Sequence, residues 1–421
     1  MKLAFVDLVF SWPPLGGAPL DLYQTMVGLQ QLGHDVKLFF AADKDLWNRG
    51  EMPPGSLPFD SQRLDFDLDT FTPEHLPARF REAVDGWRPD VVFVCFGFFM
   101  KPYVTKALAG YPLVCRYYAY EVACLRDYRQ FWKKTTCPND YLNTPNVCRR
   151  CTASALSKDI RTARINSYAR EYLAAGAHRP DYYDVLVESV RAYDAIIVYN
   201  HMTKRHLSAL NSNIHVIPGG VHAGEFAFTP PPQRKPGEKK VILMTGRAID
   251  FSKGLRVIQR CGELLAQRRD DFEFWVTIEA PFVQKAPWIR PLGWHDVSEL
   301  PAFYQQADIC VVPSVWEEPF GMVAVEAMAT GRPVCVSRVG GLQEIITPGE
   351  TGFIYDRNDH AALAGHLETL LDQPDLRARM GEAGRRRVEQ EYDWPRIMQK
   401  YYPPLLESAR ASAIMKKAKT A

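Results

Sequence analysis

The stretch that decides the fold runs from Val311 to Gly341 and reads V-V-P-S-V-W-E-E-P-F-G-M-V-A-V-E-A-M-A-T-G-R-P-V-C-V-S-R-V-G-G. It opens with an apolar run that is typical of a short buried parallel strand and ends before Pro313. Residues 320–330 then carry apolar side chains at helical spacing, with Gly331 placed as a C-terminal stop. Residues 333–337 read as the next strand, so the stretch predicts one βαβ unit.

Two carboxylates frame the loop and the helix of this unit. Glu318 lies in the loop before the helix, and Glu326 follows eight residues later, near the helix middle. The peptide N–H groups of Phe320, Gly321 and Met322 fall at the expected helix start, where the helix offers them no acceptor and its dipole is positive. This arrangement predicts an anion site beside Glu318. Two acids alone fit an ordinary solvated helix face equally well, so the surrounding motifs have to decide.

Length and composition bound the class of protein. The chain has 421 residues, of which 47% are hydrophobic and 24% charged, as in a globular enzyme of two or three domains. The formal net charge of +2 argues against a polyanionic partner, so we expect no nucleic acid. Nine cysteines without a recognisable export signal indicate a reducing compartment. We therefore expect a cytoplasmic protein, with the inner membrane surface as an open alternative.

The first half begins with an α/β pattern. Residues 2–10 read as a central strand, residues 11–17 as a Pro/Gly loop, residues 18–32 as a helix and residues 36–40 as the next strand. The loop lacks the G-x-G-x-x-G pattern, so a dinucleotide cofactor is not expected. Gly16 and Gly17 would let the backbone approach a bound group closely, and a tight turn alone is the alternative.

The second half repeats the pattern after a Pro-rich linker at residues 228–240. A strand at residues 241–245 leads into Gly246-Arg247 and then Lys253-Gly254. Arg offers a fork to phosphate oxygens and Lys a point charge, so Arg247 and Lys253 are candidates for a phosphate clamp. A pair of surface charges is the alternative. Downstream, Gly293 and Trp294 lie in a loop before the next helix.

A cysteine-containing basic insert occupies about residues 121–180, and we expect it to be rich in loops. Cys148 and Cys151 form a C-x2-C pair, which can hold two corners of a tetrahedral zinc, and Cys124 and Cys137 are candidates for the other two. Reduced thiols or a disulfide remain the alternatives. Basic residues outnumber the acids of the insert: Lys133, Lys134, Arg149, Arg150, Lys158, Arg161, Arg164 and Arg170. This face suits a phosphorylated acceptor or an anionic membrane surface, or is simply solvated.

Taken together, several motifs carry a resemblance to a known family. They are P-F-G from Pro319, E-A-M-A-T-G-R-P-V from Glu326, G-G-L-Q-E from Gly340, the Gly-Arg and Lys-Gly pairs, and the early Gly-Gly loop followed by L-G-H-D-V from Leu32. In this combination the chain resembles the family-4 retaining glycosyltransferases, the glycosyl transferases group 1. The resemblance implies the GT-B fold, with two doubly wound Rossmann-like domains facing across a cleft.

The expected domains follow from the resemblance. Residues 1–225 are expected to form the N-terminal, acceptor-side domain, and residues 226–398 the C-terminal domain that binds the nucleotide sugar. Residues 399–421 are expected to form a helix that returns to the first domain, followed by a basic tail.

The resemblance also implies the activity. It is retaining, metal-independent transfer of a hexosyl group from a nucleotide sugar, most simply a UDP-sugar, to an acceptor hydroxyl in the biosynthesis of a glycan, glycolipid or glycosylated natural product. The acceptor is open between a saccharide, a lipid-linked group and a small molecule. Two rivals remain: another GT-B enzyme, such as a nucleotide-sugar epimerase or phosphorylase, and a non-catalytic nucleotide-sugar-binding protein.

The roles of single residues follow from the same resemblance. Glu318 would face the donor sugar, Glu326 would hold the ribose hydroxyls, and Arg247 and Lys253 would clamp the diphosphate. Gly16-Gly17 would face the donor phosphate and the acceptor, the Phe320–Met322 amides would lie at the phosphate, and the loop at Gly293-Trp294 would lie near the base. Glu317, one residue earlier, is expected to be peripheral and its substitution nearly silent.

The chain departs from the family pattern after its fourth expected strand, at residues 113–118. Many relatives have a histidine there that approaches the donor sugar, whereas this chain has Tyr118, Ala119, Tyr120 and Glu121. The residue that would contact the outer hydroxyls of the sugar is therefore left open.

Overall fold

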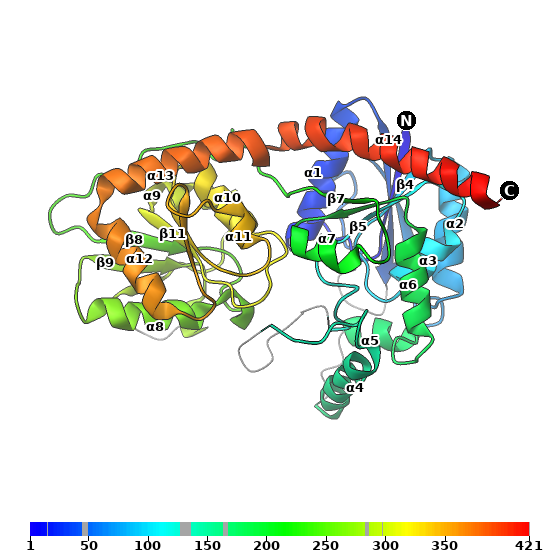
Figure 1. Ribbon diagram of the computed structural model, residues 1–421, viewed down its shortest axis with the longest axis horizontal. Helices are drawn as coiled ribbons and strands as arrows, with labels where there is room; N and C mark the ends of the chain where they lie inside the picture. Colours follow the sequence, from blue (N-terminus) through cyan, green and yellow to red (C-terminus); the bar gives the residue numbers. More distant parts are fainter. Residues whose placement is uncertain are drawn as a thin grey trace. The chain divides into compact units, whose positions relative to one another are not determined.

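The protein is represented by a computed structural model that describes residues 1–14, 16–43, 49–126, 136–162, 167–282, 286–296 and 298–420. The chain forms two compact units. Unit 1 comprises residues 1–129, 137–217 and 398–421, and unit 2 comprises residues 130–136 and 218–397. Each unit is an α/β body around its own parallel sheet (Figure 1).

In the described residues, the sheet of unit 1 has seven strands in the order β3-β2-β1-β4-β5-β6-β7, all paired in parallel. They are β1 (Lys2–Asp7), β2 (Asp35–Asp43), β3 (Asp60–Phe66), β4 (Val91–Val94), β5 (Leu113–Arg116), β6 (Ala195–Val198) and β7 (Ile214–Val216). The strand order reverses between β1 and β4. In open α/β sheets ligands bind beyond the carboxyl ends of the strands at such a switch point.

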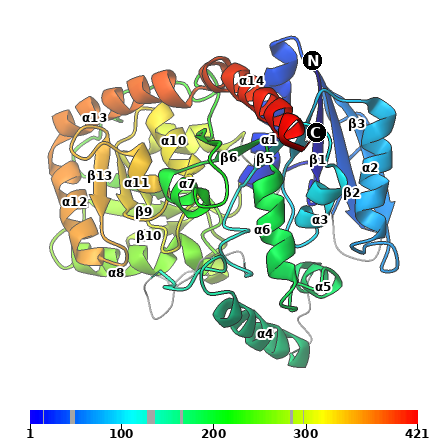
Figure 2. The ribbon, with the colours of Figure 1, turned by 45° about the vertical axis from the view of Figure 1, so that its right-hand side comes forward.

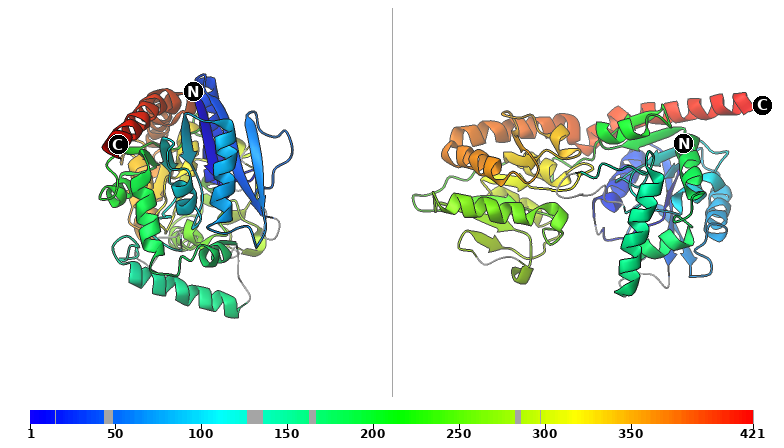
Figure 3. Two further views of the ribbon diagram at one scale, coloured as in Figure 1. Left: turned by 90° about the vertical axis from the view of Figure 1, so that its right-hand side faces the viewer. Right: turned by 60° about the horizontal axis from the view of Figure 1, so that its bottom comes forward.

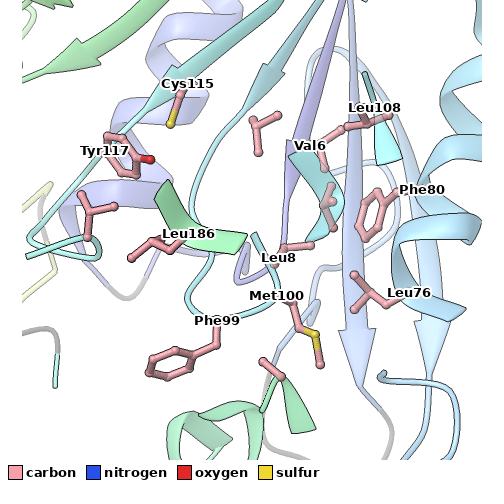
Figure 4. Packing of buried hydrophobic residues seen from close by; sticks show 14 of the residues in the cluster. Val6, Leu8, Leu76, Phe80, Phe99, Met100, Leu108, Cys115, Tyr117 and Leu186 are labelled. Carbon is pink, nitrogen blue, oxygen red and sulfur yellow. The ribbon is translucent and has the colours of Figure 1, made fainter. Parts of the chain in front are cut away.

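The helices of unit 1 follow the strands. They are α1 (Gly17–Gln31), α2 (His75–Trp87), α3 (Lys101–Ala107), α4 (Pro145–Arg161), α5 (Ser167–Ala174), α6 (Tyr182–Ala192) and α7 (His201–Leu207). Helix α3 packs against both α2 and α6. Figure 4 shows the core beside these helices, where Leu76 and Phe80 of α2 lie with Val6 of β1 in one buried cluster. Central strands such as β4 and β6 are continuous apolar runs because both of their faces are covered.

The sheet of unit 2 has six strands in the described residues, in the order β10-β9-β8-β11-β12-β13, again all parallel. They are β8 (Lys240–Met244), β9 (Phe272–Val276), β10 (Ile289–Pro291), β11 (Ile309–Val312), β12 (Val334–Ser337) and β13 (Gly352–Tyr355). The expected βαβ unit is present as β11, α10 and β12. The fold class predicted from the sequence, two Rossmann-like α/β bodies, is confirmed.

The helices of unit 2 complete the alternation of strand and helix. They are the 3-10 turns η1 (Phe251–Lys253) and η2 (Ala280–Phe282), α8 (Leu255–Ala266), α9 (Leu300–Gln306), α10 (Met322–Ala329), α11 (Leu342–Ile345), α12 (His360–Asp372), α13 (Pro374–Arg387) and the π-helical turn η3 (Val388–Tyr392). The last helix, α14 (Trp394–Thr420), starts in unit 2 and contributes its residues from 398 onward to unit 1. No helix in the described ranges is both long and apolar enough to span a bilayer.

The insert after β5 is more helical than the expected loop-rich segment. Helix α4 begins with Pro145, which is favoured at the first helical position because its missing N–H costs nothing there. Its inward residues Cys148, Thr152 and Leu156 recur every four positions, and Leu156 belongs to the unit 1 core. Figures 2 and 3 show α4 at the margin of unit 1, away from the sheet.

Candidate functional site

The loop between β8 and α8 carries the two predicted phosphate-binding cations. Gly254 has a φ of 84°, and a side chain there would place its Cβ 1.9 Å from the carbonyl oxygen of Pro313. Only glycine therefore lets the η1 turn pack against the end of β11. The turn is closed by Asp250, whose side chain accepts a hydrogen bond from the Ser252 N–H at 2.9 Å. This geometry brings Lys253 to the loop that holds Glu318, whereas Arg247 lies exposed in the first part of the loop.

Glu318 is the centre of a cluster of polar side chains. Its Oε2 accepts hydrogen bonds from Lys253 Nζ at 2.9 Å, Trp316 Nε1 at 2.9 Å and Ser314 Oγ at 3.0 Å. The side chain of Glu318 is 14% exposed and that of Lys253 is 28% exposed, so both reach solvent. The structure thus brings together the predicted sugar-facing carboxylate and one of the two predicted phosphate cations.

The Gly-Gly pair after β12 explains how the Glu318 loop is shaped. A Cβ on Gly340 would lie 2.0 Å from the carbonyl oxygen of Glu318, and one on Gly341 would lie 2.5 Å from that of Pro319. The Gly341 N–H donates to the Glu318 carbonyl at 2.7 Å. Backbone therefore packs directly on backbone, which no other residue type permits. The two glycines hold the loop in place rather than merely ending a strand.

Glu317, expected to be peripheral, is instead buried, with 6% of its surface exposed. Its Oε2 accepts a hydrogen bond from the Gly340 N–H at 2.7 Å, and its Oε1 pairs with the Arg357 guanidinium. The expectation of a peripheral Glu317 was wrong because its partners come from distant parts of the sequence. Glu318, not Glu317, contacts Lys253, and the assignment of Glu318 to the donor sugar stays a prediction.

The start of α10 has the geometry expected of an anion-binding turn. Gly321, at the N-cap, has a φ of 122°, and a Cβ there would lie 2.3 Å from a methyl group of Leu342. Phe320 is buried and packs against the ring of Tyr392, with centroids 5.8 Å apart. Met322 opens the helix. The first-turn N–H groups point out of the helix, along the positive end of its dipole.

Glu326 lies within α10 and is 7% exposed. Its Oε2 accepts a hydrogen bond from the hydroxyl of Tyr304 at 2.7 Å, and that hydroxyl also lies 2.7 Å from Thr245 Oγ1. Burial raises the pKa of Glu326, and the Tyr304 hydrogen bond opposes the rise. The chain Thr245–Tyr304–Glu326 fixes one carboxylate oxygen and joins the end of β8 to α9 and α10.

The remaining predicted donor-side residues lie in two places. In unit 2, Gly293 has a φ of 83°, and the Trp294 N–H donates to Glu279 Oε1 at 3.2 Å, while the indole is 61% exposed. In unit 1, Gly16 and Gly17 begin α1, and an added Cβ on either would meet no atom within 4 Å. Packing within unit 1 does not require glycine there, so the space beside them is open.

Among the described residues, none of the four cysteines of the insert is recorded in a disulfide. Across the described ranges no three His, Cys, Asp or Glu side chains gather in a way that could hold a metal. Burial raises the pKa of the Cys148 thiol to about 11, with Cys124 and Cys137 close enough to add to the rise, and Cys151 is exposed. The geometry lends no support to the zinc hypothesis, which stays a prediction. Three of the basic residues, Lys133, Lys134 and Arg164, lie outside the described residues.

Several residues of the site were not foreseen from the sequence. Ser314 and Trp316 bind Glu318, and Tyr304 binds Glu326. Ser314 and Trp316 stand within four residues of Glu318, so a polar side chain on the same loop was the available signal. Tyr304 lies in a different helix, and nothing in the local sequence connects it with Glu326.

Comparisons with known proteins agree with this geometry. Residues 289–387 match the family model described as glycosyl transferases group 1. A D-inositol 3-phosphate glycosyltransferase of Arthrobacter sp. (strain FB24) is 36% identical over 210 residues, which are 45% of this chain and 49% of that protein. This match spans about half the length of that relative.

Two solved structures align along nearly the whole chain. Sucrose-phosphate synthase from Thermosynechococcus elongatus has a TM-score of 0.66 at 19% identity and covers 98% of this chain and 99% of its own. The HepE protein of Anabaena, solved in complex with UDP and glucose, has a TM-score of 0.65 at 17% identity, covering 96% and 99%. At these identities the likeness shows the fold. Residues 289–387 are thus similar to the glycosyl transferases group 1 family, and the two α/β units of the chain have the GT-B fold that the sequence motifs predicted.

Proposed function

We propose that this chain transfers a sugar from a UDP-sugar to an acceptor hydroxyl with retention of the anomeric configuration. The observation that carries the proposal is the contact between Lys253 and Glu318 beside the start of α10. It sets a cation suited to a diphosphate next to a carboxylate suited to sugar hydroxyls. The family match and the UDP bound in the HepE structure favour the same activity for this chain.

The proposed reaction needs no side chain that acts as a strong base. The bond between the anomeric carbon and the diphosphate oxygen breaks, and its electron pair leaves with the nucleotide. A bond to the acceptor oxygen forms on the same face, and the departing phosphate oxygen takes the acceptor proton. Lys253, Arg247 and the N–H groups that open α10 would stabilise the growing charge on the phosphate. A metal ion is not required in this scheme.

Glu318 acts in the proposal as a holder of sugar hydroxyls. A carboxylate close to a diphosphate is repelled by it, so Glu318 is not expected to attack the anomeric carbon. Donor binding would draw Lys253 toward the phosphate and leave the Glu318 oxygen free for a hydroxyl. Glu326 would hold the ribose hydroxyls through the carboxylate oxygen that Tyr304 does not bind.

The test is a screen of nucleotide sugars against hydroxyl acceptors. Nucleotide release is measured together with the anomeric configuration of the product by NMR. Acceptor-dependent release of UDP with a retained product supports the proposal, and an inverted product overturns its stereochemistry. Release of an epimerised sugar without acceptor, or formation of a sugar phosphate only with inorganic phosphate, would identify the rival GT-B enzymes. Tight UDP-sugar binding without turnover would identify a binding protein.

The acceptor is proposed only as a hydroxyl compound, either a saccharide, a lipid-linked group or a small molecule. We also propose contact with an anionic membrane surface, because the insert exposes the cations Arg150, Lys158 and Arg161. Sedimentation with vesicles that contain anionic lipid, against neutral vesicles at equal salt, tests it. Equal binding to both would remove the membrane from the list of partners.

A further inference from the structure

A buried charged cluster joins three loops at the carboxyl edge of the unit 1 sheet. Its first member, Asp7, ends β1 and is almost fully buried. One carboxylate oxygen accepts a hydrogen bond from the Val9 N–H at 2.8 Å, and the other accepts one from the Phe96 N–H at 3.0 Å. Asp7 thus ties the loop after β1 to the loop after β4, at the switch point of the sheet.

The second member, Lys101, opens α3 and is equally buried. Its Nζ donates a hydrogen bond to the carbonyl oxygen of Arg116, the last residue of β5, at 3.0 Å. It also lies 4.2 Å from the ring centroid of Tyr117 and 3.7 Å from Glu121 Oε2. One ammonium group therefore holds both the end of β5 and the loop that follows it.

The third member, Glu121, lies in that loop, and its side chain is 4% exposed. Within the described part of the chain neither carboxylate oxygen makes a hydrogen bond of full strength, and the Tyr118 backbone and the Lys101 ammonium group are the neighbours that help to stabilise its charge. A buried carboxylate without strong hydrogen bonds is costly, so the nearby ammonium group is what makes its position tenable. Asp7, with two N–H partners, is less dependent on Lys101. The Lys101–Glu121 pair is therefore the adjustable part of the cluster.

We infer that the Lys101–Glu121 pair positions the loop of residues 117–126 for the transfer reaction proposed above, on which this inference rests. Ligands of open α/β sheets bind beyond the carboxyl ends of the strands at the switch point, and this loop leaves β5 at that edge. Glu121 is a positioning residue, since its buried side chain cannot touch a substrate. Of the loop residues, Ala119 and Cys124 are half-buried and Arg126 is exposed, so the loop keeps accessible surface beyond the buried Tyr118 and Tyr120.

The Lys101–Glu121 pair should respond to pH, which a purely apolar packing contact would not do. Burial raises the pKa of Glu121 to about 7, Lys101 opposes the rise, and Asp7 adds to it. The titratable and charged groups around Glu121 come from every element packed against it: Asp7 of β1, Cys95 after β4, Lys101 of α3, Cys115 and Arg116 of β5, Tyr117 after it and Tyr193 after α6. The ion pair therefore forms fully only above neutral pH.

The test compares Glu121→Gln, Lys101→Met and the double variant with the wild type, and Glu82→Gln on the exposed face of α2 serves as a control. Each single variant is expected to lower kcat by roughly 10–100-fold, the cost of a misplaced loop, with UDP affinity within twofold. The kcat of the double variant should be no lower than that of the less active single variant, because the two partners act as one unit. We expect the wild-type rate to fall below pH 7 as Glu121 takes up a proton, and Glu121→Gln should lose this fall.

Hydrogen exchange of the loop peptide, residues 117–126, separates this inference from the proposed function. Lys101→Met, which leaves the Glu121 carboxylate without its ammonium partner, should exchange faster in this peptide, with peptides of unit 2 unchanged. Wild-type kcat and pH profile in Glu121→Gln would overturn the inference, as would unchanged exchange. A wild type without transfer activity would overturn the proposed function instead, and the exchange data would still decide whether the pair holds the loop. Should Lys101→Met not fold, the isosteric Glu121→Gln decides alone.

Discussion

Lys253 Nζ lies 2.9 Å from Glu318 Oε2, at the place where Gly254 brings the η1 turn against the end of β11. The two side chains are 28% and 14% exposed, so solvent screens this ion pair only in part. A diphosphate that binds at the start of α10 would offer Lys253 two negative charges. Lys253 could therefore exchange Glu318 for the diphosphate at little cost in free energy. The pair keeps the cation and the carboxylate oriented until the donor separates them.

Glu318→Gln is expected to lower turnover strongly while leaving UDP affinity nearly unchanged, because UDP lacks the sugar that Glu318 would hold. Kinetics with a UDP-sugar and calorimetric titration with UDP measure the two effects. The matched variant is Glu317→Gln, one residue away. If Glu317→Gln alone were inactive in a folded protein, the assignment of Glu318 would be shifted by one residue.

Glu317→Gln is expected to act on stability instead. The substitution leaves the Arg357 guanidinium without its buried carboxylate and weakens the bond to the Gly340 N–H. Breaking a buried pair typically costs about 3–5 kcal/mol, and retention of one amide oxygen puts the expected loss toward about 3 kcal/mol. Denaturant unfolding measures it. An unfolding free energy equal to that of the wild type would contradict the buried role of Glu317.

Glu326→Ala is expected to weaken UDP binding by about 1.5–3 kcal/mol, the worth of hydrogen bonds to a charged acceptor. Tyr304→Phe is the informative companion, since it removes the hydroxyl that binds Glu326 and leaves the carboxylate in place. Its effect on UDP affinity should be smaller than about 1.5 kcal/mol. Calorimetry on both variants decides, and an unchanged dissociation constant in Glu326→Ala would remove Glu326 from the site.

Arg247→Ala and Lys253→Ala are expected to reduce turnover by roughly 10²–10³-fold, by analogy with the loss of a single donor to a transition-state oxyanion. Neither should disturb folding, since Arg247 is exposed and Lys253 is only partly covered. Arg256→Ala, an exposed cation on the neighbouring helix α8, is the control. Wild-type turnover in both variants at saturating donor would show that the phosphate clamp is misassigned.

The glycines show how much of the site the sequence could predict. The Lys253-Gly254 and Gly340-Gly341 pairs were recognisable in the sequence as motifs. In the structure their glycines lie in close backbone contacts that admit no other residue. The sequence could also predict the βαβ unit and the order of its loop and helix, since apolar periodicity and glycine stops are local signals. The contact of Lys253 with Glu318 joins residues 65 positions apart, and the motif pattern placed both at the donor without predicting that they touch.

What the sequence could not predict depends on distant partners. Glu317 and Glu318 have the same side chain but different environments. Glu317 is buried because it binds Arg357 and Gly340, which are remote in the sequence. The edge strand β3 reads D-S-Q-R-L-D-F, with too few apolar residues to signal a strand, and its register with β2 supplies the missing information. The D-x-D sequence at residues 65–67 begins inside this strand.

The zinc hypothesis gives a prediction about the insert. If the four thiols of Cys124, Cys137, Cys148 and Cys151 bind zinc, the site is structural, because four thiolates leave no open position for water. Elemental analysis should then find about one zinc per chain, and the thiols should resist a mild alkylating reagent. Metal-free protein with four reactive thiols would instead support reduced cysteines without a metal, the alternative to zinc.

The last prediction concerns the pH dependence of stability at Glu121. Its pKa is 4.5 in the unfolded chain and about 7 in the folded protein, where burial disfavours the charge. Between these values the folded protein holds a proton that the unfolded chain has released, so stability falls as pH rises through this window. A shift of this size corresponds to about 3 kcal/mol.

Glutamine has the same shape and does not titrate, so Glu121→Gln should gain stability relative to the wild type between pH 5 and pH 8. Unfolding by denaturant across this range measures the difference, with Glu82→Gln as the exposed control that should run parallel to the wild type. Asp7→Asn should show its own change at lower pH, since the pKa of Asp7 is raised from 3.8 to about 6. Parallel curves for Glu121→Gln and the wild type would mean that Glu121 keeps its charge in the folded protein, and the buried pair with Lys101 would then be a permanent ion pair without a titrating member.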